Sequence, residues 1–160
     1  MPQSSRSTQV SQVVKAPRAV VYQAFIDADA VASWLPPDGM TGQIHAFEPY
    51  AGGRFSMSLT YVKQEDRPRG KSSDDTDTVD GKFAELIPDE KVVQVTEFAS
   101  DDPDFAGEMR ITWSLADIEG GTEVTVLCEG IPSGIRLEDN ELGSSVSLRK
   151  LAAFVERGTA

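Results

Sequence analysis

A long run of strand-like alternation, followed by one long amphipathic stretch, constrains the fold of this sequence more than any other feature. Between Met40 and Gly130 the apolar spacing is typical of strands, whereas between Asp139 and Arg157 it is typical of a helix. Alternation along antiparallel strands indicates that one face of their sheet is covered. The sequence therefore predicts an α+β fold, in which a curved antiparallel sheet of about six or seven strands wraps around a long C-terminal helix.

The expected strands share alternating apolar side chains and end at turn residues. In one of them Phe55, Met57 and Leu59 alternate with small polar residues, so these apolar side chains share one face. Tight connections are expected at Pro88–Glu90 and Glu119–Gly121. The expected strands are Thr8–Lys15, Met40–Phe47, Arg54–Val62, Val79–Ile87, Lys91–Ser100, Glu108–Asp117 and Thr122–Gly130.

Two short helices are expected between the first two strands. Pro17 suits the first turn of a helix over Arg18–Asp27. A second helix is expected over Asp29–Leu35, with Asp29 as its N-cap. The hydrophilic stretch Lys63–Asp80 is too long for a tight hairpin, and we expect a mobile loop there. No repeat or linker divides the chain, so residues 1–160 are interpreted as one domain, with its core over about residues 8–157.

Composition argues against several classes of protein. The 15 Lys and Arg residues against 26 Asp and Glu residues give a formal charge of −11, which repels nucleic acid and anionic lipid. No apolar run approaches the roughly 18 residues of a membrane span, and Met1–Thr8 lacks the apolar core of a secretory signal. A cytoplasmic location is therefore expected. The single cysteine, Cys128, lies in a strand pattern and is interpreted as a buried apolar residue.

Five segments carry a resemblance to a known family. They are Val14–Phe25, Trp34, Gly52–Phe55, Gly81–Val93 and Gly121–Val126. Together they resemble the Hsp90 ATPase activator homologue family of the SRPBCC superfamily, which includes START domains and pollen-allergen-like (Bet v 1-like) proteins. The resemblance implies the helix-grip fold of that superfamily. It also implies either a cavity that binds small molecules or a role as a chaperone ATPase regulator.

The sequence departs from the family pattern at three places. Gln94, Thr96 and Glu97 occupy a strand that is usually aromatic and apolar in the family, which predicts a more polar pocket. The tryptophan common in the closing segment is absent, and that segment reads Glu141–Ser145. The histidine often found after the last strand is also missing, since the chain has Glu129–Pro132 there.

The leading functional hypothesis is an internal cavity, between the sheet and the C-terminal helix, that binds an apolar or amphipathic small molecule. Trp34 and Ile131–Glu138 are expected near its mouth. Ser144, Ser145 and Ser147 are small and would leave room on the helix side. The candidate ligand-binding residues are Trp34, Phe55, Met57, Leu59, Tyr61, Phe83, Gln94, Thr96, Met109, Ile111, Trp113, Val124, Leu142, Val146, Leu148 and Leu151.

Two other functional classes stay open at this point. A cyclase- or hydrolase-like enzyme would need a general acid or base in the cavity, for which Glu97, Glu108 and Tyr61 are the candidates. A regulator of a chaperone ATPase would act through the outer face of the sheet, as a monomer or a homodimer. With His45 as the only histidine and no calcium-loop spacing around Asp75, no metal and no cofactor are expected.

Overall fold

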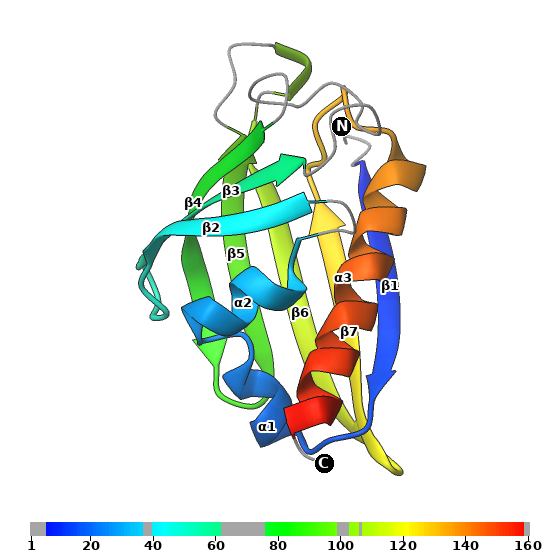
Figure 1. The fold of residues 1–160 in the computed structure, drawn as a ribbon. Helices are drawn as coiled ribbons and strands as arrows, with labels where there is room; N and C mark the ends of the chain where they lie inside the picture. Colours follow the sequence, from blue (N-terminus) through cyan, green and yellow to red (C-terminus); the bar gives the residue numbers. More distant parts are fainter. Residues whose placement is uncertain (1–5, 37–39, 62–75, 99–102, 106, 159–160) are drawn as a thin grey trace.

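The computed structural model describes residues 6–36, 40–61, 76–98, 103–105 and 107–158. Within these residues, seven strands form one antiparallel sheet in the order β1-β7-β6-β5-β4-β3-β2. The sheet curls around the C-terminal helix α3, while the short helices α1 and α2 lie across its lower end (Figure 1). This arrangement is the predicted helix-grip fold.

The observed elements follow the predicted order closely. In addition to seven strands and three α-helices, the described residues Pro103–Phe105 form a short 3-10 helix, η2. The strands are β1 (Ser7–Val14), β2 (Met40–Phe47), β3 (Arg54–Tyr61), β4 (Thr76–Ile87), β5 (Lys91–Phe98), β6 (Met109–Ile118) and β7 (Gly121–Glu129). The helices are α1 (Arg18–Gln23), α2 (Ala28–Trp34) and α3 (Leu137–Gly158).

The polar stretch between β3 and β4 is shorter than predicted. Residues 76–78 were expected only in the loop, but they extend β4 before its predicted start at Val79, where Thr76 pairs with Thr60 and Thr78 with Ser58. Pairing along β3 satisfies their backbone groups in spite of their hydrophilic side chains. The rest of the expected mobile loop, residues 63–75, lies outside the described residues, as does Val62, the expected end of the preceding strand.

The two short helices also differ from their predicted boundaries. Helix α1 ends at Gln23 instead of Asp27, because Asp27 takes an extended conformation and caps α2. Its carboxylate accepts hydrogen bonds from the backbone N–H of Asp29 at 3.0 Å and of Ala30 at 3.3 Å. The prediction of Asp29 as the N-cap is therefore wrong by two residues, although an aspartate does perform the capping.

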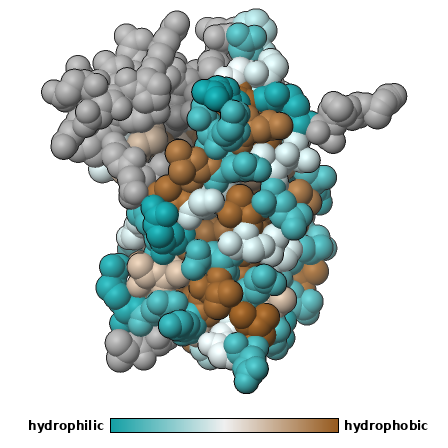
Figure 2. All heavy atoms as spheres, turned by 90° about the vertical axis from the view of Figure 1, so that its right-hand side faces the viewer, coloured by the Kyte–Doolittle hydropathy of each residue, from teal (hydrophilic) through white to brown (hydrophobic). Residues whose placement is uncertain are grey.

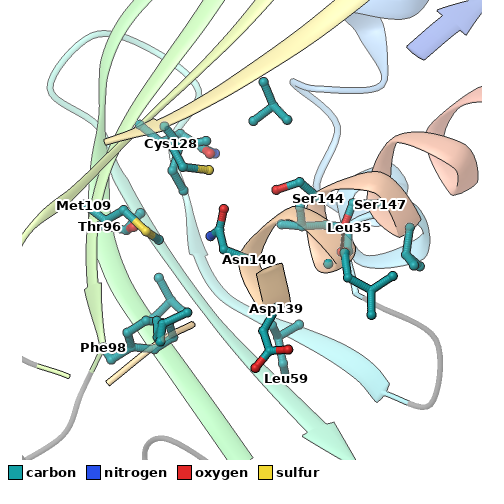
Figure 3. Close-up of a pocket in the computed structure, with 18 of the residues that line it drawn as sticks. Leu35, Leu59, Thr96, Phe98, Met109, Cys128, Asp139, Asn140, Ser144 and Ser147 are labelled. Carbon is teal, nitrogen blue, oxygen red and sulfur yellow. Dashed lines mark hydrogen bonds between the residues drawn. The ribbon is translucent and has the colours of Figure 1, made fainter. Parts of the chain in front are cut away.

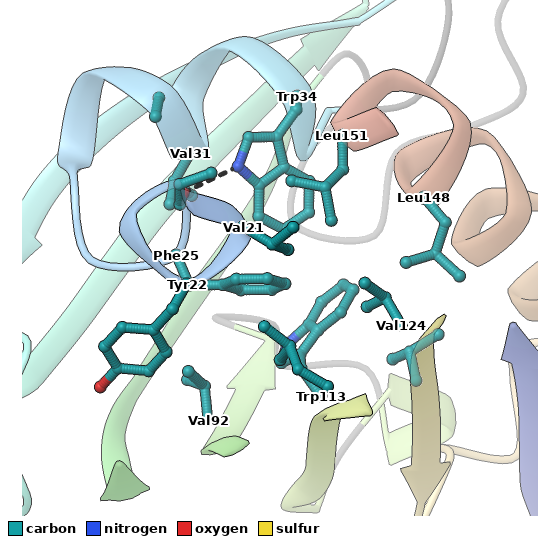
Figure 4. Close-up of a cluster of buried hydrophobic side chains, with 14 of the residues drawn as sticks. Val21, Tyr22, Phe25, Val31, Trp34, Val92, Trp113, Val124, Leu148 and Leu151 are labelled. Carbon is teal, nitrogen blue, oxygen red and sulfur yellow. Dashed lines mark hydrogen bonds between the residues drawn. The ribbon is translucent and has the colours of Figure 1, made fainter. Parts of the chain in front are cut away.

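Aromatic rings close the lower end of the molecule. Phe25 from the end of α1, Trp34 from α2 and Trp113 from β6 meet in edge-on or tilted contacts, with ring centroids 5.0–5.4 Å apart. The buried indole of Trp34 donates to the backbone oxygen of Ala24 at 2.9 Å, which fixes its orientation (Figure 4). Such contacts add to the burial of large apolar surfaces, so this end is a packed core.

Helix α3 packs tightly against the rest of the protein along its C-terminal half. Leu148, Leu151 and Val155 belong to the continuous buried core, and Figure 4 shows Leu148 and Leu151 facing Val124 and the aromatic cluster. The N-terminal half of the helix carries smaller and more polar residues. The two halves of α3 therefore have different roles, and the second half anchors the helix. None of the described helices has the length and apolar character to cross a membrane.

Candidate functional site

A cavity of about 990 Å³ lies between the inner face of the sheet and the first half of α3. Figure 3 shows its strand side, with Thr96, Met109 and Cys128, and its helix side, with Asn140 and Ser144. Its lining residues are Leu35, Met40, Phe55, Met57, Leu59, Val79, Gln94, Thr96, Phe98, Met109, Ile111, Trp113, Val126, Cys128, Gly134, Ile135, Arg136, Asp139, Asn140, Leu142, Gly143, Ser144, Val146, Ser147 and Arg149.

Strand register explains how the sheet wall is assembled. Paired residues of antiparallel strands face the same side. Gln94 of β5 pairs with Ile111 of β6, which pairs in turn with Cys128 of β7. Thr96 pairs with Met109 on the same face. The alternation that was visible in the sequence thus places one row of side chains from β5, β6 and β7 into the cavity.

Small residues on α3 explain why the space stays open on the helix side. Gly143, Ser144 and Ser147 line the cavity, and their side chains are too small to fill the space between α3 and the strands. The hydroxyl of Ser147 instead donates to the backbone oxygen of Leu35 at 2.6 Å, which ties α3 to the end of α2. One turn further, leucines fill the equivalent space, so side-chain size along α3 divides the interior into a cavity and a packed core.

A group of hydrogen-bonded polar side chains joins β1, β7 and α3 at one side of the cavity. The hydroxyl of Thr8 donates a hydrogen bond to the side-chain oxygen of Asn140. Burial raises the pKa of the Cys128 thiol, and hydrogen bonds with Ser144, Thr8 and Asn140 only partly oppose this effect. The thiol therefore stays protonated and neutral at ordinary pH. It is a polarisable wall group and not an activated nucleophile.

Two polar groups on β5 differ in how they are satisfied. The side-chain oxygen of Gln94 accepts a hydrogen bond from the Trp113 indole at 3.1 Å. Thr96 is 2% exposed, and its hydroxyl has no hydrogen-bond partner among the described residues. Buried polar groups are nearly always hydrogen-bonded, so the Thr96 hydroxyl is an exception within this cavity.

The charged lining residues lie at the rim. Arg136, Asp139 and Arg149 are all exposed, and Arg136 forms an ion pair with Glu138 at 2.9 Å. Leu142, at 64% exposure, adds an apolar edge to the same rim. Figure 2 views the molecule from its α3 and β1 side, where apolar and hydrophilic side chains are interleaved over the surface. The rim is thus amphipathic, while the inner wall is largely apolar.

The cavity gathers ten of the sixteen residues that were predicted for the ligand site. They come from the three strands β3, β5 and β6 and from α3. These ten are Phe55, Met57, Leu59, Gln94, Thr96, Met109, Ile111, Trp113, Leu142 and Val146.

Five other predicted site residues lie in the packed core. Phe83, Val124, Leu148 and Leu151 face inward as expected, but they belong to the packed core and do not line the cavity. Trp34 was expected near the mouth, and this expectation is wrong. The residue is 1% exposed, because its indole packs against Phe25 and Trp113 at the lower end of the molecule. The side chain of the sixteenth residue, Tyr61, lies outside the described residues.

Sequence reasoning missed several lining residues. Cys128 was recognised as inward-facing but was treated only as a buried apolar residue. Asn140 was not among the predicted site residues, although Asn140, Gly143, Ser144 and Ser147 recur at helical spacing and so share one face. That spacing was the available signal for Asn140.

Two of the three acid–base candidates, Glu97 and Glu108, do not lie in the cavity, and the side chain of the third, Tyr61, lies outside the described residues. Glu97 and Glu108 are exposed and border a shallower hollow on the other side of the sheet, beside Arg54 and Lys82. His45 is also exposed, with its ring nitrogen 2.7 Å from the Ser58 hydroxyl. Within the part of the chain that the structure describes, no three His, Cys, Asp or Glu residues are grouped as metal ligands. The two glutamates therefore cannot act on a molecule in the cavity.

Fold and site together define a helix-grip domain with an internal, mostly apolar cavity. The family model described as "Activator of Hsp90 ATPase homolog 1-like protein" matches residues 15–156. The chain belongs to this family, in agreement with the resemblance seen in the sequence. No curated protein matches the chain.

Solved structures carry the same fold. A protein from Chromobacterium violaceum is 32% identical, with a TM-score of 0.82, over 94% of this chain and 96% of that one. A protein from Rhodobacter sphaeroides is 17% identical, with a TM-score of 0.76, over 94% and 92% of the two chains. An AHSA1-like protein from Aeromonas hydrophila is 15% identical, with a TM-score of 0.72, over 96% and 94%. The last two show likeness of fold alone.

Proposed function

We propose that this protein binds an apolar or amphipathic small molecule in the cavity between the sheet and α3. The observation that carries this proposal is the cavity itself, at about 990 Å³ with a mainly apolar wall and a few polar groups. Ligand sites in proteins commonly measure about 300–1,000 Å³ and combine an apolar lining with a small number of placed polar groups. The cavity lies at the upper end of that range.

Packing supports the proposal because the open space is localised. Protein interiors are close-packed, and large voids carry a cost in lost contacts. Here the second half of α3 packs fully, through Leu148 and Leu151, while Gly143 and Ser144 leave the first half apart from the sheet. A ligand would restore the missing contacts. Binding requires no covalent chemistry, which agrees with a neutral thiol and with glutamates outside the cavity.

A matched pair of variants tests the proposal. Ser144 lines the cavity, whereas its neighbour Ser145 does not. Calorimetric titration with fatty alcohols, fatty acids and polyketides should detect binding to the wild type. Ser144→Phe places a ring in the cavity and should weaken binding at least tenfold, while Ser145→Phe should leave it within about twofold. Equal affinity in both variants, or no binding by the wild type, would count against the proposal.

A second candidate function comes from the description of the family, which refers to an activator of the Hsp90 ATPase. In that case the outer face of the sheet would contact the chaperone, and the net charge of −11 would favour a basic partner surface. Chaperone ATPase rates measured with and without the purified protein test this function. An unchanged rate at saturating protein would remove it.

A further inference from the structure

Thr96 has the most unusual polar group in the cavity. Its hydroxyl lacks a partner among the described residues, although the side chain is almost wholly buried. The register explains why: on the inner face Thr96 lies between Met109 of β6 and Gly81 of β4. A thioether is a weak acceptor and a glycine has no side chain, so neither strand neighbour can satisfy the hydroxyl.

Three other polar side chains of the cavity already have a hydrogen-bond partner in the protein. Asn140 accepts from Thr8, and Ser147 donates to Leu35. Gln94 accepts from the Trp113 indole. A buried polar group without a partner costs free energy. A ligand that supplies a partner to Thr96 therefore gains more binding free energy from that hydrogen bond than from a contact elsewhere on the wall.

The charge of that partner follows from where the ionised groups lie. Among the described lining residues, the charged ones are Arg136, Asp139 and Arg149, and all three are exposed at the rim. The inner wall near Thr96 offers Met109, Phe98 and Cys128. An ionised head group beside them would lose its hydration without gaining a counter-ion. A neutral hydroxyl or carbonyl group has a much smaller hydration free energy to lose.

We infer that the ligand of this cavity is an uncharged amphipathic molecule whose hydroxyl or carbonyl oxygen hydrogen-bonds with the Thr96 hydroxyl. The inference rests on the proposed function and names the chemistry of its ligand. Met109 lies beside Thr96 in Figure 3. Rotation of the threonine side chain, or movement of the flexible methionine, brings the hydroxyl and the ligand oxygen together.

Three probes with a ten-carbon chain distinguish a neutral, an anionic and a cationic head group. They are decan-1-ol, decanoate and decyltrimethylammonium, each titrated calorimetrically. Wild-type protein should bind decan-1-ol most tightly. Thr96→Val, which keeps the side-chain shape but removes the hydroxyl, should weaken decan-1-ol about three- to tenfold, the worth of one hydrogen bond. It should leave decyltrimethylammonium, which has neither a hydrogen-bond donor nor an acceptor, unchanged. Thr96→Ser should retain most of the affinity for the alcohol.

Two controls complete the design. Thr125→Val removes a hydroxyl on the opposite face of the sheet, where it lies 2.8 Å from Ser11 Oγ, and should not alter any affinity. Ser144→Phe, which places a ring in the cavity, should weaken every probe that binds there and so reports whether a probe occupies the cavity. The melting temperature of ligand-free Thr96→Val should equal or exceed that of the wild type. The substitution removes a buried hydroxyl that has no partner, and with it the free-energy cost of burying that group.

The outcomes distinguish this inference from the proposed function. If the probes bind to the wild type and are weakened by Ser144→Phe, but Thr96→Val does not change the affinity for decan-1-ol, the inference is wrong and cavity binding stands. Tightest binding of decanoate would also overturn it and would point to the rim arginines. If none of the probes, nor any compound of the titration panel, binds to the wild type, the proposed function itself fails. Unfolding of Thr96→Val would show that the hydroxyl is satisfied in the native state, which contradicts the inference.

Discussion

Two valines on α3 offer a direct test of how the interior is divided. Val155 is 4% exposed and belongs to the continuous packed core. Val146 is 8% exposed, but it lines the cavity and lies outside that core. Replacing each by alanine removes the same groups from the same helix. Any difference in stability between the two variants therefore reports the packing around each side chain.

The expected magnitudes follow from the environment of each valine. Two lost methyl groups cost about 1.6 kcal/mol of transfer free energy, and at Val155 the new void adds roughly 1 kcal/mol. The higher helix propensity of alanine returns about 0.5 kcal/mol at both sites. Val155→Ala should thus lower the free energy of unfolding by about 2 kcal/mol. Val146→Ala should lower it by at most about 1 kcal/mol, because its methyl groups already border open space.

Urea unfolding measures both values in ligand-free protein. The fluorescence of Trp34 and Trp113, which are both buried, follows the loss of the core. The two variants should share the wild-type slope and differ in midpoint. Equal destabilisation within about 0.5 kcal/mol would refute the reasoning, since Val146 would then be packed as closely as Val155.

Three further predictions concern other parts of the molecule. Asp27→Ala removes the cap of α2 and should cost about 1 kcal/mol in urea unfolding, whereas Asp29→Ala should cost less than half as much; equal losses would disprove the assignment of the cap. Gln94→Leu leaves the buried Trp113 indole without its acceptor and should cost about 1–3 kcal/mol; a neutral result would mean that the indole finds another partner. Burial raises the pKa of the Cys128 thiol, so its contribution to stability is complete below the pKa of the unfolded thiol and is lost as pH rises through the folded value. Wild type should therefore lose more stability than Cys128→Ala between about pH 8 and pH 10, and parallel losses would contradict this account.

Most of the fold could be predicted from periodicity. Alternation along Arg54–Tyr61 and helical spacing along α3 both persist in the structure, because burial on one face enforces them. Errors arose where local signals compete. Two aspartates near α2 can each act as a cap, and backbone geometry selects Asp27. Residues 76–78 are hydrophilic, but pairing with β3 makes them part of a strand.

The candidate site could be predicted only in part. Periodicity identifies inward-facing side chains, but it does not tell whether a side chain such as Ile111 borders open space or, like Leu151, is surrounded by others. That distinction depends on the distance between α3 and the sheet, which the placement of small residues and of α2 decides. The position of Trp34 was missed for the same reason, since it depends on how α2 folds against the sheet.

Native mass spectrometry of gently purified protein tests the central claim most directly, because it detects whether a small molecule occupies the cavity. The account predicts an added mass that is lost on denaturation, or one that forms on incubation with decan-1-ol. This mass should be absent from Ser144→Phe and present in Ser145→Phe, because only Ser144 lines the cavity. A mass equal to that of the bare chain under every condition, or the same adduct on both variants, would contradict the claim that the cavity is the binding site.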